Sequence, residues 1–352
     1  MATITGIFAN LAPIKIGGSP DFGSEFTRAL SKASEVAVCT GYVAVESVIE
    51  LTKLIDVFTN LEKFDLIVGM AKFDGLTRPQ ISALEQLDGL LLARNLGGVY
   101  LSAALPVHSK VSLFESEEGP RVILGSSNLG SLTRATRQYE VDVLVQSDEV
   151  FVHQIESFLT LCLSASRPFQ EVAEQIKVIP VGQHPLENLN GVQEIPLKEI
   201  PVPLGRKYEI PVGVNPRSGL NVFFGKGRKS IDGRLLPRPW YEVELIVPKS
   251  ITALPGYPTV DHDNGAFQVV TDDGYQFWCK TSGDYSKNLR SLGDLETLGR
   301  WIKGRLEQSG VLQPGDIATP ETLNAYGRRT ITLSKTVKPG VWLLDFSVIP
   351  ND

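Results

Sequence analysis

Residues 106–145 read PVHSKVSLFESEEGPRVILGSSNLGSLTRATRQYEVDVLV, and this segment carries the most informative pattern in the chain. Its first part predicts a strand over Val107–Phe114, a short acidic turn, and a second strand over Arg121–Leu124. Because side chains alternate along a strand, His108 and Lys110 would project from one face, opposite an apolar face. An imidazole and an ammonium would therefore lie side by side.

The second predicted strand ends in the turn Gly125-Ser126-Ser127-Asn128. Small residues at a strand end allow backbone N–H groups and an amide side chain to approach a ligand closely. A third strand over Tyr139–Val145 would alternate again, with Glu140 and Asp142 on one face and a tyrosine and three valines on the other. The segment thus supplies a histidine, a lysine, an asparagine and carboxylates around one set of strands.

These side-chain types suit phosphodiester chemistry. A neutral imidazole can attack phosphorus and hold the phosphoryl group covalently. Lysine and asparagine can donate hydrogen bonds to the non-bridging oxygens, where charge must be stabilised during transfer. A carboxylate on the second ring nitrogen would fix the tautomer and orientation of the imidazole. With these fixed cations and N–H donors, the sequence predicts that no metal and no cofactor is needed.

The pattern resembles the HxK…GSxN motif of the phospholipase D superfamily. The matching residues are His108, Lys110, Gly125, Ser126 and Asn128, with Glu140 at the downstream acidic position. The resemblance implies catalytic roles for all of these except Gly125. The superfamily's usual aspartate, five residues after the lysine, is Glu115 here, and single-motif nucleases of the superfamily often lack that aspartate. Two copies of the motif make one active site in the superfamily, so the single copy here implies a homodimer.

Other interpretations of some of these residues stay open. A lone His-x-Lys pair also fits ordinary residues on a half-exposed strand, although the Gly-Ser-x-Asn turn favours catalysis. Thr40-Gly41-Tyr42, inside a predicted buried strand over Val36–Val45, could lie near the site, but core packing is the simpler explanation for Tyr42. Arg134 and Arg137 could guide a polyanion or lie on a solvated loop.

Length and composition place the chain among ordinary globular proteins. Its 352 residues favour two domains, and 42% hydrophobic and 21% charged residues are typical values. The net charge of −6 argues against a protein that is basic throughout, but it does not exclude a local basic surface. Cys39, Cys162 and Cys279 form no CxxC pair, so we expect reduced core thiols and no zinc site. We expect no secretion signal and no membrane span, and therefore a cytoplasmic protein.

The first half alternates predicted strands and helices. This alternation indicates an α/β layer structure, and a phospholipase D-like domain of this class has a mixed sheet between helices. A helix around residues 22–30 has Asp21 or Ser24 as its possible cap. The other expected elements are strands over Val36–Val45, Phe64–Ala71 and Val99–Leu101 and helices over Glu46–Leu61, Thr77–Leu92 and Phe151–Ser164.

The second half of the chain has a different residue pattern. Residues 171–205 are rich in proline with little periodicity, which predicts a linker. Beyond Lys207, short strands separated by Gly and Pro turns suggest a barrel or sandwich, with one clear helix over Leu295–Gln308. The expected strands are Tyr208–Val214, Trp240–Val247, Ala266–Val270, Tyr275–Lys280, Thr330–Leu333 and Val341–Ser347.

Basic residues gather in two loops of this half, over 217–238 and 280–290. Lysines and arginines interleaved with glycine, asparagine and serine suit phosphate neutralisation combined with base-edge contacts. Solvated surface loops are the alternative. The candidate DNA-binding residues are Arg217, Asn221, Lys226, Arg228, Lys229, Arg234, Lys280, Ser282, Asp284, Tyr285, Lys287 and Arg290.

Together the two halves resemble restriction endonucleases of the BfiI/NgoAVII-like type. These join an N-terminal phospholipase D-like nuclease domain to a mainly-β C-terminal DNA-binding pseudobarrel, and the NgoAVII-like branch is the closer match. The resemblance implies a nuclease and dimerisation domain over 1–170, a linker over 171–205 and a sequence-specific DNA-binding domain over 206–352. Some members of the branch work with a separate helicase-like ATPase. This chain has no Walker-type loop, so any ATP dependence must come from such a partner.

We therefore expect a homodimeric, metal-independent restriction endonuclease that hydrolyses double-stranded DNA through a covalent phosphohistidine. One alternative is another phosphodiesterase of the same superfamily, which would have no use for a basic β-domain. A second alternative is a non-catalytic DNA-binding protein that carries a decayed enzyme domain.

Overall fold

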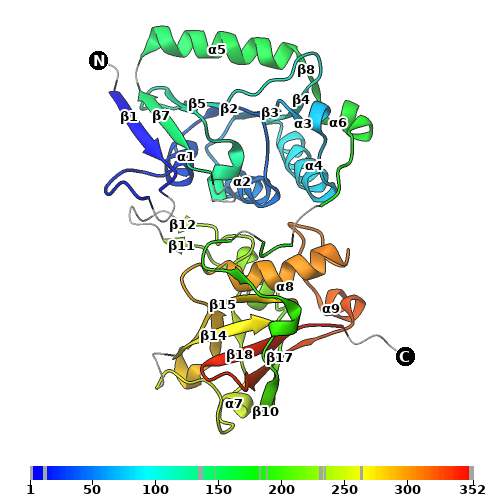
Figure 1. Ribbon diagram of the computed structural model, residues 1–352. Coiled ribbons are helices and arrows are strands. Elements are labelled where there is room, and N and C mark those ends of the chain that lie inside the picture. Colours follow the sequence, from blue (N-terminus) through cyan, green and yellow to red (C-terminus); the bar gives the residue numbers. More distant parts are fainter. Residues whose placement is uncertain are drawn as a thin grey trace. The chain divides into compact units, whose positions relative to one another are not determined.

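The computed structural model describes residues 3–10, 14–133, 138–146, 148–181, 184–187, 189–229, 233, 235–261 and 265–348. The chain divides into two compact units, Met1–Val181 and Gly182–Asp352 (Figure 1). Each unit is built on its own large sheet. The division falls inside the stretch 171–205 that the sequence analysis treats as a linker.

The first unit contains a mixed sheet with the strand order β1-β7-β6-β5-β2-β3-β4-β8. β2, β3 and β4 are parallel to one another, and the remaining neighbours in this order are antiparallel. This arrangement confirms the predicted mixed sheet. The strands are β1 (Thr3–Phe8), β2 (Glu35–Thr40), β3 (Lys63–Val68), β4 (Gly97–Ser102), β5 (Val111–Glu115), β6 (Arg121–Gly125), β7 (Val141–Gln146) and β8 (Ser166–Pro168).

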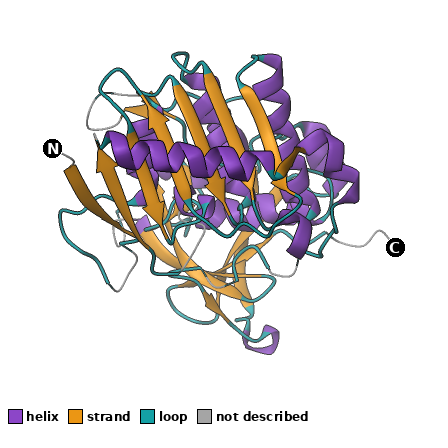
Figure 2. Ribbon diagram, turned by 90° about the horizontal axis from the view of Figure 1, so that it is seen from above, coloured by secondary structure: helices purple, strands orange, loops and turns teal. Residues whose placement is uncertain are grey.

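One long helix, α5 (Glu149–Ser164), crosses the strands on one face of this sheet (Figure 2). Its apolar side chains Val152 and Leu159 pack in one cluster with Cys39 of β2 and Leu113 of β5. Burial of these side chains supplies the hydrophobic driving force that holds the helix on the sheet.

The opposite face is covered by three helices, and two shorter helices follow β3 and β8 (Figure 1). Phe26 packs edge to face on Phe114 of β5, with ring centroids 5.1 Å apart. The sheet is therefore buried on both sides, which explains why β3 is apolar over most of its length. The helices are α1 (Phe22–Leu30), α2 (Val45–Val57), α3 (Ala71–Asp74), α4 (Arg78–Ala93) and α6 (Phe169–Val172).

Local capping chemistry sets several helix starts. Asp21 caps α1 by accepting a hydrogen bond from the Ser24 N–H at 3.1 Å, so the aspartate is the cap of the two candidates. Thr77 and Gln80 form a reciprocal capping box at the start of α4, where Pro79 occupies the first turn. The predicted helix over Thr77–Leu92 is thus confirmed to within a residue.

The sequence analysis assigned no strand before the helix around residues 22–30 and therefore missed β1. Thr3–Phe8 pairs with β7 along its whole length, from Thr3 opposite Gln146 to Phe8 opposite Val141. In this strand only Ile7 is buried. An edge strand with solvent on much of its surface has little hydrophobic alternation, so its sequence gives a weak signal.

The second unit contains a sheet with the strand order β10-β17-β18-β14-β15-β16-β13, and β9 pairs with β15. β14 and β18 are parallel, and the other pairs are antiparallel. The sheet curls into a half-barrel, in agreement with the predicted pseudobarrel (Figure 1). Its strands are β9 (Gln193–Glu194), β10 (Pro203–Pro211), β13 (Leu245–Ile246), β14 (Ala266–Thr271), β15 (Tyr275–Ser282), β16 (Asn288–Ser291), β17 (Thr330–Thr336) and β18 (Val341–Asp345).

The unit also contains a separate hairpin and helices. A separate hairpin consists of β11 (Arg228–Lys229) and β12 (Leu235–Leu236). The helices are α7 (Lys249–Thr252), α8 (Thr297–Gln308) and α9 (Pro320–Tyr326). The strand expected over Trp240–Val247 is limited to β13, because residues 237–244 form turns and irregular backbone instead.

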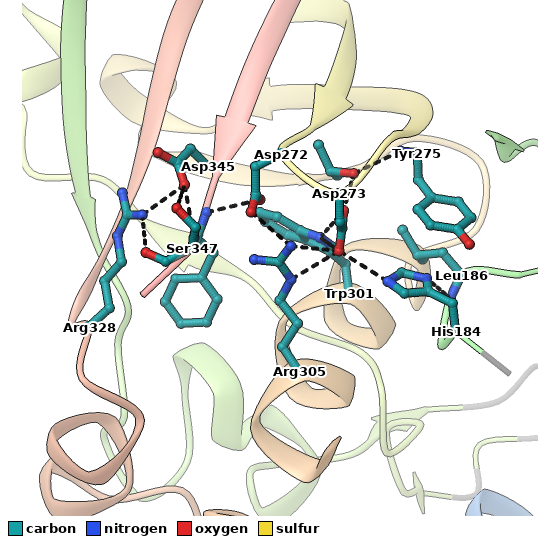
Figure 3. A network of polar contacts seen from close by, with 12 residues as sticks. His184, Leu186, Asp272, Asp273, Tyr275, Trp301, Arg305, Arg328, Asp345 and Ser347 are labelled. Atoms are coloured by element: carbon teal, nitrogen blue, oxygen red, sulfur yellow. Dashed lines mark hydrogen bonds and ion pairs between the residues drawn. The ribbon is translucent and has the colours of Figure 1, made fainter. Parts of the chain in front are cut away.

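A polar network fastens the start of the second unit to its sheet and to α8 (Figure 3). The His184 ring stacks on Tyr275, with centroids 4.1 Å apart, and its Nε2 lies 3.0 Å from Asp273 Oδ2. Arg305 of α8 forms ion pairs with Asp273 at 2.6 Å and with Asp272 at 2.9 Å. Despite burial, these donors hold the pKa of Asp273 well below its usual range.

The three cysteines are free and buried, as predicted. Burial raises the pKa of Cys39 to about 12. Within the part of the chain that the structure describes, no helix has the length and apolar character required to cross a membrane.

Candidate functional site

The residues of the His-x-Lys and Gly-Ser-x-Asn patterns lie together at one end of the first unit's sheet. At this end β2 and β3 finish, β5 begins and β6 finishes. His108 and Lys110 precede β5, which begins at Val111, so the prediction that they lie within a strand over Val107–Phe114 is wrong. They belong to an irregular segment that leads into the strand. Their side chains are therefore not restricted to the alternating directions that side chains take along a strand.

Two glycines let this segment approach the parallel strands. A Cβ atom on Gly69, just after β3, would lie 1.8 Å from the carbonyl oxygen of Val107. A Cβ atom on Gly41, just after β2, would lie 2.9 Å from Cδ2 of His108 and 3.3 Å from Oδ1 of Asn128. Only glycine permits such close approach without displacement. His108 and Asn128 therefore both lie against Gly41.

We expect Gly69→Ala to destabilise the fold by about 2 kcal/mol, because the new methyl group overlaps the Val107 carbonyl. Cleavage activity should fall further than the folded fraction does, since the displaced backbone is the one that carries His108. Urea denaturation and an activity assay at a temperature where the variant stays folded measure the two effects. Gly89→Ala is the matched control: nothing lies within 4 Å of its Cβ position on α4, and helix propensity predicts a gain of about 0.5–1 kcal/mol. Unchanged stability in Gly69→Ala would contradict the assigned approach.

The imidazole of His108 is exposed and is flanked by Lys110 and Tyr42. Lys110 Nζ lies 3.0 Å from Nδ1 and 3.2 Å from Nε2, and it donates to the His108 carbonyl oxygen at 2.6 Å. An ammonium group only donates, so a ring nitrogen that faces it holds a lone pair, as a nucleophile requires. Burial lowers the pKa of Lys110, and the nearby charge of Glu140 acts in the opposite direction.

Tyr42 belongs to the site rather than to the core. Its ring meets the His108 ring edge to face at 5.5 Å, and its hydroxyl donates to Asp74 Oδ2 at 2.6 Å. The expectation of core packing is therefore wrong: the side chain is 42% exposed. The motif signal alone did not indicate this contact, because Tyr42 is far from His108 in the sequence.

Asn128 is oriented by the end of β2. Its Oδ1 accepts from the Tyr42 N–H at 3.1 Å and lies 3.4 Å from Thr40 Oγ1, while the Leu129 N–H donates to that threonine at 3.1 Å. With the oxygen engaged by donors, the amide NH2 of Asn128 is directed to other partners. This orientation suits donation to a phosphate oxygen.

Asp142 of β7 holds the turn that contains Asn128, a role that the sequence analysis did not assign. The Ser127 N–H donates to Asp142 Oδ1 at 3.0 Å, and the Ser127 hydroxyl donates to Oδ2. Both residues are buried. Burial raises the pKa of Asp142, and the hydrogen bonds from Ser127 oppose that effect. The buried face of β7 is therefore that of Asp142 and Leu144, whereas Val141 is exposed.

Backbone contacts to Val141 fix the other small residues of the turn. Ser126 donates through its N–H to the Val141 carbonyl at 3.1 Å and accepts from the Val141 N–H through Oγ at 3.1 Å. A Cβ atom on Gly125 would lie 2.5 Å from the same carbonyl oxygen. Glycine is thus required here by the neighbouring strand, not only by the approach of a ligand as the sequence interpretation had it.

The two glutamates singled out in the sequence lie in different places. Glu140 is near enough to Lys110 to influence its charge, but among the described residues no hydrogen bond joins it to His108. Glu115 ends β5, at the opposite end of that strand from His108. Its side chain is half-buried beneath α5, so it is not part of this site.

In the second unit, three of the candidate DNA-binding residues share one exposed sheet face. Lys280 and Ser282 alternate with buried residues on β15, and Arg290 of β16 lies opposite Lys280 in the register. Trp278, two residues before Lys280, is 48% exposed on the same face, and sequence reasoning did not list it. A cationic surface with an exposed aromatic ring is suited to a nucleic acid.

The loop after β15 presents Tyr285. Tyr285 and Ser286 adopt positive φ values of 60° and 56°, a strained conformation for residues other than glycine. The Tyr285 ring is exposed, and Lys249 Nζ lies 4.3 Å from its centroid. Asp284 and Lys287 pair with each other at 3.5 Å. Lys249 was not identified from the sequence.

Asn221 is a correction to the list of DNA-binding candidates. It is buried, its Nδ2 donates to the Ala318 carbonyl at 2.8 Å, and its Oδ1 accepts from the Ala318 N–H at 2.9 Å. Its amide joins two loops and is not available to a base edge. The sequence alone does not show whether the side chain of a polar loop residue faces a ligand or forms hydrogen bonds to neighbouring backbone groups.

The remaining candidates lie in or near the β11–β12 hairpin. Arg228 forms an ion pair with buried Glu242, which also binds Arg238. Arg217, Lys226 and Lys229 are exposed. The candidates outside the described residues are Arg234 and, in the first unit, Arg134 and Arg137.

Two family models match the chain, one for each unit. The model described as the NgoFVII restriction endonuclease N-terminal PLD domain matches residues 24–173. The model described as the NgoFVII C-terminal B3-like DNA-binding domain matches residues 205–337. A comparison with curated protein sequences gave no match.

Several solved structures share similarity with part of the chain. The phospholipase D family member Nuc from Salmonella typhimurium is 14% identical, over 48% of this chain and 98% of its own, with a TM-score of 0.35. NucT from Helicobacter pylori is 15% identical, over 48% of this chain and 100% of its own, with a TM-score of 0.34. A phosphatidylserine synthase from Haemophilus influenzae is 14% identical, over 47% of this chain and 40% of its own, with a TM-score of 0.36. TM-scores of this size support no conclusion about the activity of this chain.

The two family models agree with the structure in order and in content. An α/β unit with a histidine, lysine and asparagine at one strand end precedes a curled β-sheet unit with a cationic face. The family is one of site-specific nucleases that carry a DNA-binding domain. The chain therefore belongs to the NgoFVII restriction endonuclease family, with an N-terminal PLD domain and a C-terminal B3-like DNA-binding domain.

Proposed function

We propose that the chain hydrolyses double-stranded DNA through a covalent phosphohistidine on His108, without a metal ion. The His108 ring of one subunit attacks phosphorus as the bond to the leaving oxygen breaks, and His108 of a second subunit protonates that oxygen. Water then attacks the phosphorus, gives its proton to the second histidine and releases the first. Both rings return to their starting protonation states, so the cycle balances.

The observation that carries this proposal is the meeting of His108, Lys110 and Asn128 at one strand end. Lys110 and Asn128 would donate to the non-bridging oxygens, with Ser126 assisting, as charge develops on the phosphoryl group. Glu140 would orient the imidazole. The group of donors is fixed by β2, β6 and β7 before any substrate binds, and such preorganisation is the main source of electrostatic catalysis.

Internally 32P-labelled DNA and full-length protein, incubated in excess EDTA, test both parts of the proposal. We expect cleavage to persist in EDTA and labelled phosphate to remain on the protein after a rapid alkaline quench. Loss of cleavage in EDTA that added Mg²⁺ restores would contradict metal independence. Cleavage without protein labelling would contradict the covalent step.

A homodimer is part of the proposal, because one motif supplies one histidine and the reaction uses two. Large apolar side chains are exposed around the site, which a second subunit could cover. These are Tyr42, Phe73, Leu105, Tyr139 and Val141. Dimerisation of the first unit would place the two histidines on either side of a twofold axis.

We expect Val141→Asp to weaken dimerisation by about ten- to a hundredfold, because it places a charge in the proposed contact. Val141 is 54% exposed, so the monomer fold should tolerate the change. Sedimentation velocity over a concentration series measures the shift. Val150→Asp is the control, since Val150 is exposed in the first turn of α5, away from the strand ends that form the site. Equal dimerisation of the wild type and Val141→Asp would remove this surface from the proposal.

For DNA binding we propose that Lys280, Ser282, Tyr285 and Arg290 contact the duplex, together with the exposed cations near β11 and β12. Arg290→Ala and Lys280→Ala should each reduce the slope of log affinity against log salt by about one, as expected for the loss of one phosphate contact. Fluorescence anisotropy at several salt concentrations provides the measurement. Lys338→Ala, in the turn between β17 and β18, should leave the slope unchanged. A slope unaltered by Arg290→Ala would exclude this face.

A separate helicase-like ATPase and a cytoplasmic location complete the proposal. The chain itself has no Walker-type loop, so ATP-dependent regulation would need a second protein. Plasmid digestion with and without such an ATPase, and with and without ATP, distinguishes an independent nuclease from a regulated one.

A further inference from the structure

A groove of about 730 Å³ lies between α5 and the first unit's sheet, near the strand ends opposite to His108. It is bounded by the start of β2 and β3 and by the end of β5, whereas the catalytic residues lie at the other ends of these strands. Figure 2 shows α5 passing over these strands. Neither the proposed reaction nor the DNA interface uses this groove.

The groove lies where a small residue occupies the sheet beneath the helix. Ala37 of β2 lies between Leu113 of β5 and Asp65 of β3 in the register. Its methyl group leaves volume next to Asp65 that α5 does not fill. Leu113, with Leu159 of α5, gives the groove an apolar lining.

Carboxylates dominate the polar lining. Glu35, Asp65 and Glu115 come from the sheet and Glu156 from α5, against one lysine and one histidine. Lys63 Nζ is 3.8 Å from Asp65 Oδ2, and His153 Nδ1 is 3.4 Å from Glu156 Oε2. Both basic groups are largely exposed, so they neutralise the acids only in part.

Two carboxylate oxygens in this groove are buried and accept no hydrogen bond. They are Oδ1 of Asp65 and Oε1 of Glu115. The Asp65 side chain is only 9% exposed. The Lys63 ammonium and the Gly98 N–H both act to lower the pKa of its carboxyl, so Asp65 is partly compensated within the chain. Burial raises the pKa of both residues, and Glu35 contributes in the same direction for each. Buried acceptors without donors are rare in native proteins, so each of these two oxygens calls for an explanation, and a bound cation is one that the acidic lining favours.

The spacing of these acids selects the class of partner. Among the described residues, no group of three or more His, Cys, Asp or Glu side chains could hold a metal ion. The acids instead line an open, partly apolar groove, and each could meet a different positive charge. A flexible chain with ammonium groups separated by methylene segments matches both properties, because the methylenes cover apolar surface and the ammonium groups supply N–H donors.

We propose that this groove is a binding site for a linear aliphatic polyamine, with its ammonium groups at Glu35, Asp65, Glu115 and Glu156 and its methylene segments on Ala37 and Leu113. The site is distinct from the catalytic residues and does not depend on the proposed reaction. Small cations of this kind accompany nucleic acids, but binding here requires no DNA.

Isothermal titration of full-length, DNA-free protein with spermidine tests the proposal. We expect one strong site per chain, and the double variant Glu35→Gln/Glu115→Gln should weaken binding by about tenfold or more, since it removes one charge at the exposed rim and one at the partly buried Glu115. Glu117→Gln is the matched control: it removes the same charge from the exposed turn after β5, outside the groove. Absence of a 1:1 site would overturn the proposal, as would equal weakening by Glu117→Gln. Equal competition by Mg²⁺ at matched ionic strength would indicate a diffuse charge effect and would overturn it too.

A second variant supplies the cation covalently. Thr160 lines the groove from the exposed side of α5, so Thr160→Lys places an ammonium group at its mouth. This variant should melt at a higher temperature than the wild type without spermidine and should lose the increase in melting temperature that spermidine gives the wild type. A lower melting temperature with an undiminished spermidine response would contradict the site.

The pH dependence has a definite sign. The groups that face the groove are Glu35, Lys63, Asp65, Glu115, His153 and Glu156. A polyamine binds the deprotonated acids, and the raised pKa values of Asp65 and Glu115 extend their protonation upward in pH. Affinity for spermidine should therefore rise from pH 5 to pH 8, and a flat profile would contradict the proposal.

Discussion

Replacement of His108 by alanine is expected to lower the rate of DNA cleavage by at least about 10³-fold in EDTA, because no other imidazole in the described site can form the phosphohistidine. Specific DNA binding should remain, since the cationic face of β15 and β16 belongs to the other unit. Cleavage is followed on a labelled duplex under single-turnover conditions, and binding by fluorescence anisotropy.

Ser109→Ala is the matched control for this variant. Ser109 is adjacent in sequence, but its hydroxyl lies 3.8 Å from Cys39 Sγ in the core rather than beside the imidazole. Its removal should leave the cleavage rate within about twofold, since one weak sulfur contact is lost. Retention of activity in His108→Ala would remove the proposed mechanism, whatever the behaviour of the control.

Mixed dimers sharpen the same prediction. Wild-type subunits mixed with an excess of His108→Ala subunits should lose activity in proportion to the wild-type homodimers that disappear, because the reaction uses a histidine from each subunit. If each wild-type subunit kept its full activity in the mixture, the shared site would be excluded while a nuclease with independent subunits would remain.

Asp142→Ala is expected to destabilise the chain by about 3 kcal/mol and to abolish most cleavage. The change leaves the Ser127 N–H and hydroxyl without acceptors in a buried place, and each unsatisfied group costs about 1–3 kcal/mol. The turn that presents Asn128 would also lose its attachment to β7. Urea denaturation gives the free energy, and activity is compared at a temperature where the variant remains folded.

Two further variants separate positioning from chemistry. Asp142→Asn keeps an oxygen for the Ser127 N–H and offers an N–H to the Ser127 hydroxyl, so it should restore much of the stability and of the rate. Glu140→Gln should alter stability by less than about 0.5 kcal/mol, as surface changes do, while lowering the rate. An Asp142→Ala variant with normal stability and rate would show that the turn holds its position without this carboxylate.

Much of the architecture follows from local patterns. Helix periodicity and caps placed α1, α4 and α8 to within a few residues, because capping groups and apolar faces are properties of neighbouring residues. β1 escaped prediction because an edge strand with one buried side chain lacks the alternation on which such predictions depend. β5 began four residues later than expected, because close contact with Gly69, not strand propensity, determines the backbone before Val111.

The candidate site shows the same division. The sequence identified His108, Lys110 and Asn128, since their spacing around two strands is itself the signal. It left Tyr42 open between the site and the core and did not identify Asp142 under the turn, because those contacts join residues far apart along the chain. Asn221 illustrates the converse. Its position in a basic loop suggested contact with DNA, but both its Nδ2 and its Oδ1 form hydrogen bonds to backbone groups within the chain.

By itself the sequence was enough to propose which chemistry this protein carries, because a histidine, a lysine and an asparagine at fixed spacings around two strands are a local pattern. It also determined that a basic β-rich half follows an α/β half, since composition and periodicity change along the chain. Only the tertiary structure decided which residues hold these groups in place and where unfilled space remains, as beneath α5. The physical reason is that hydrogen bonds and close contacts form between strands that are neighbours in space but distant in sequence, and no single segment encodes them.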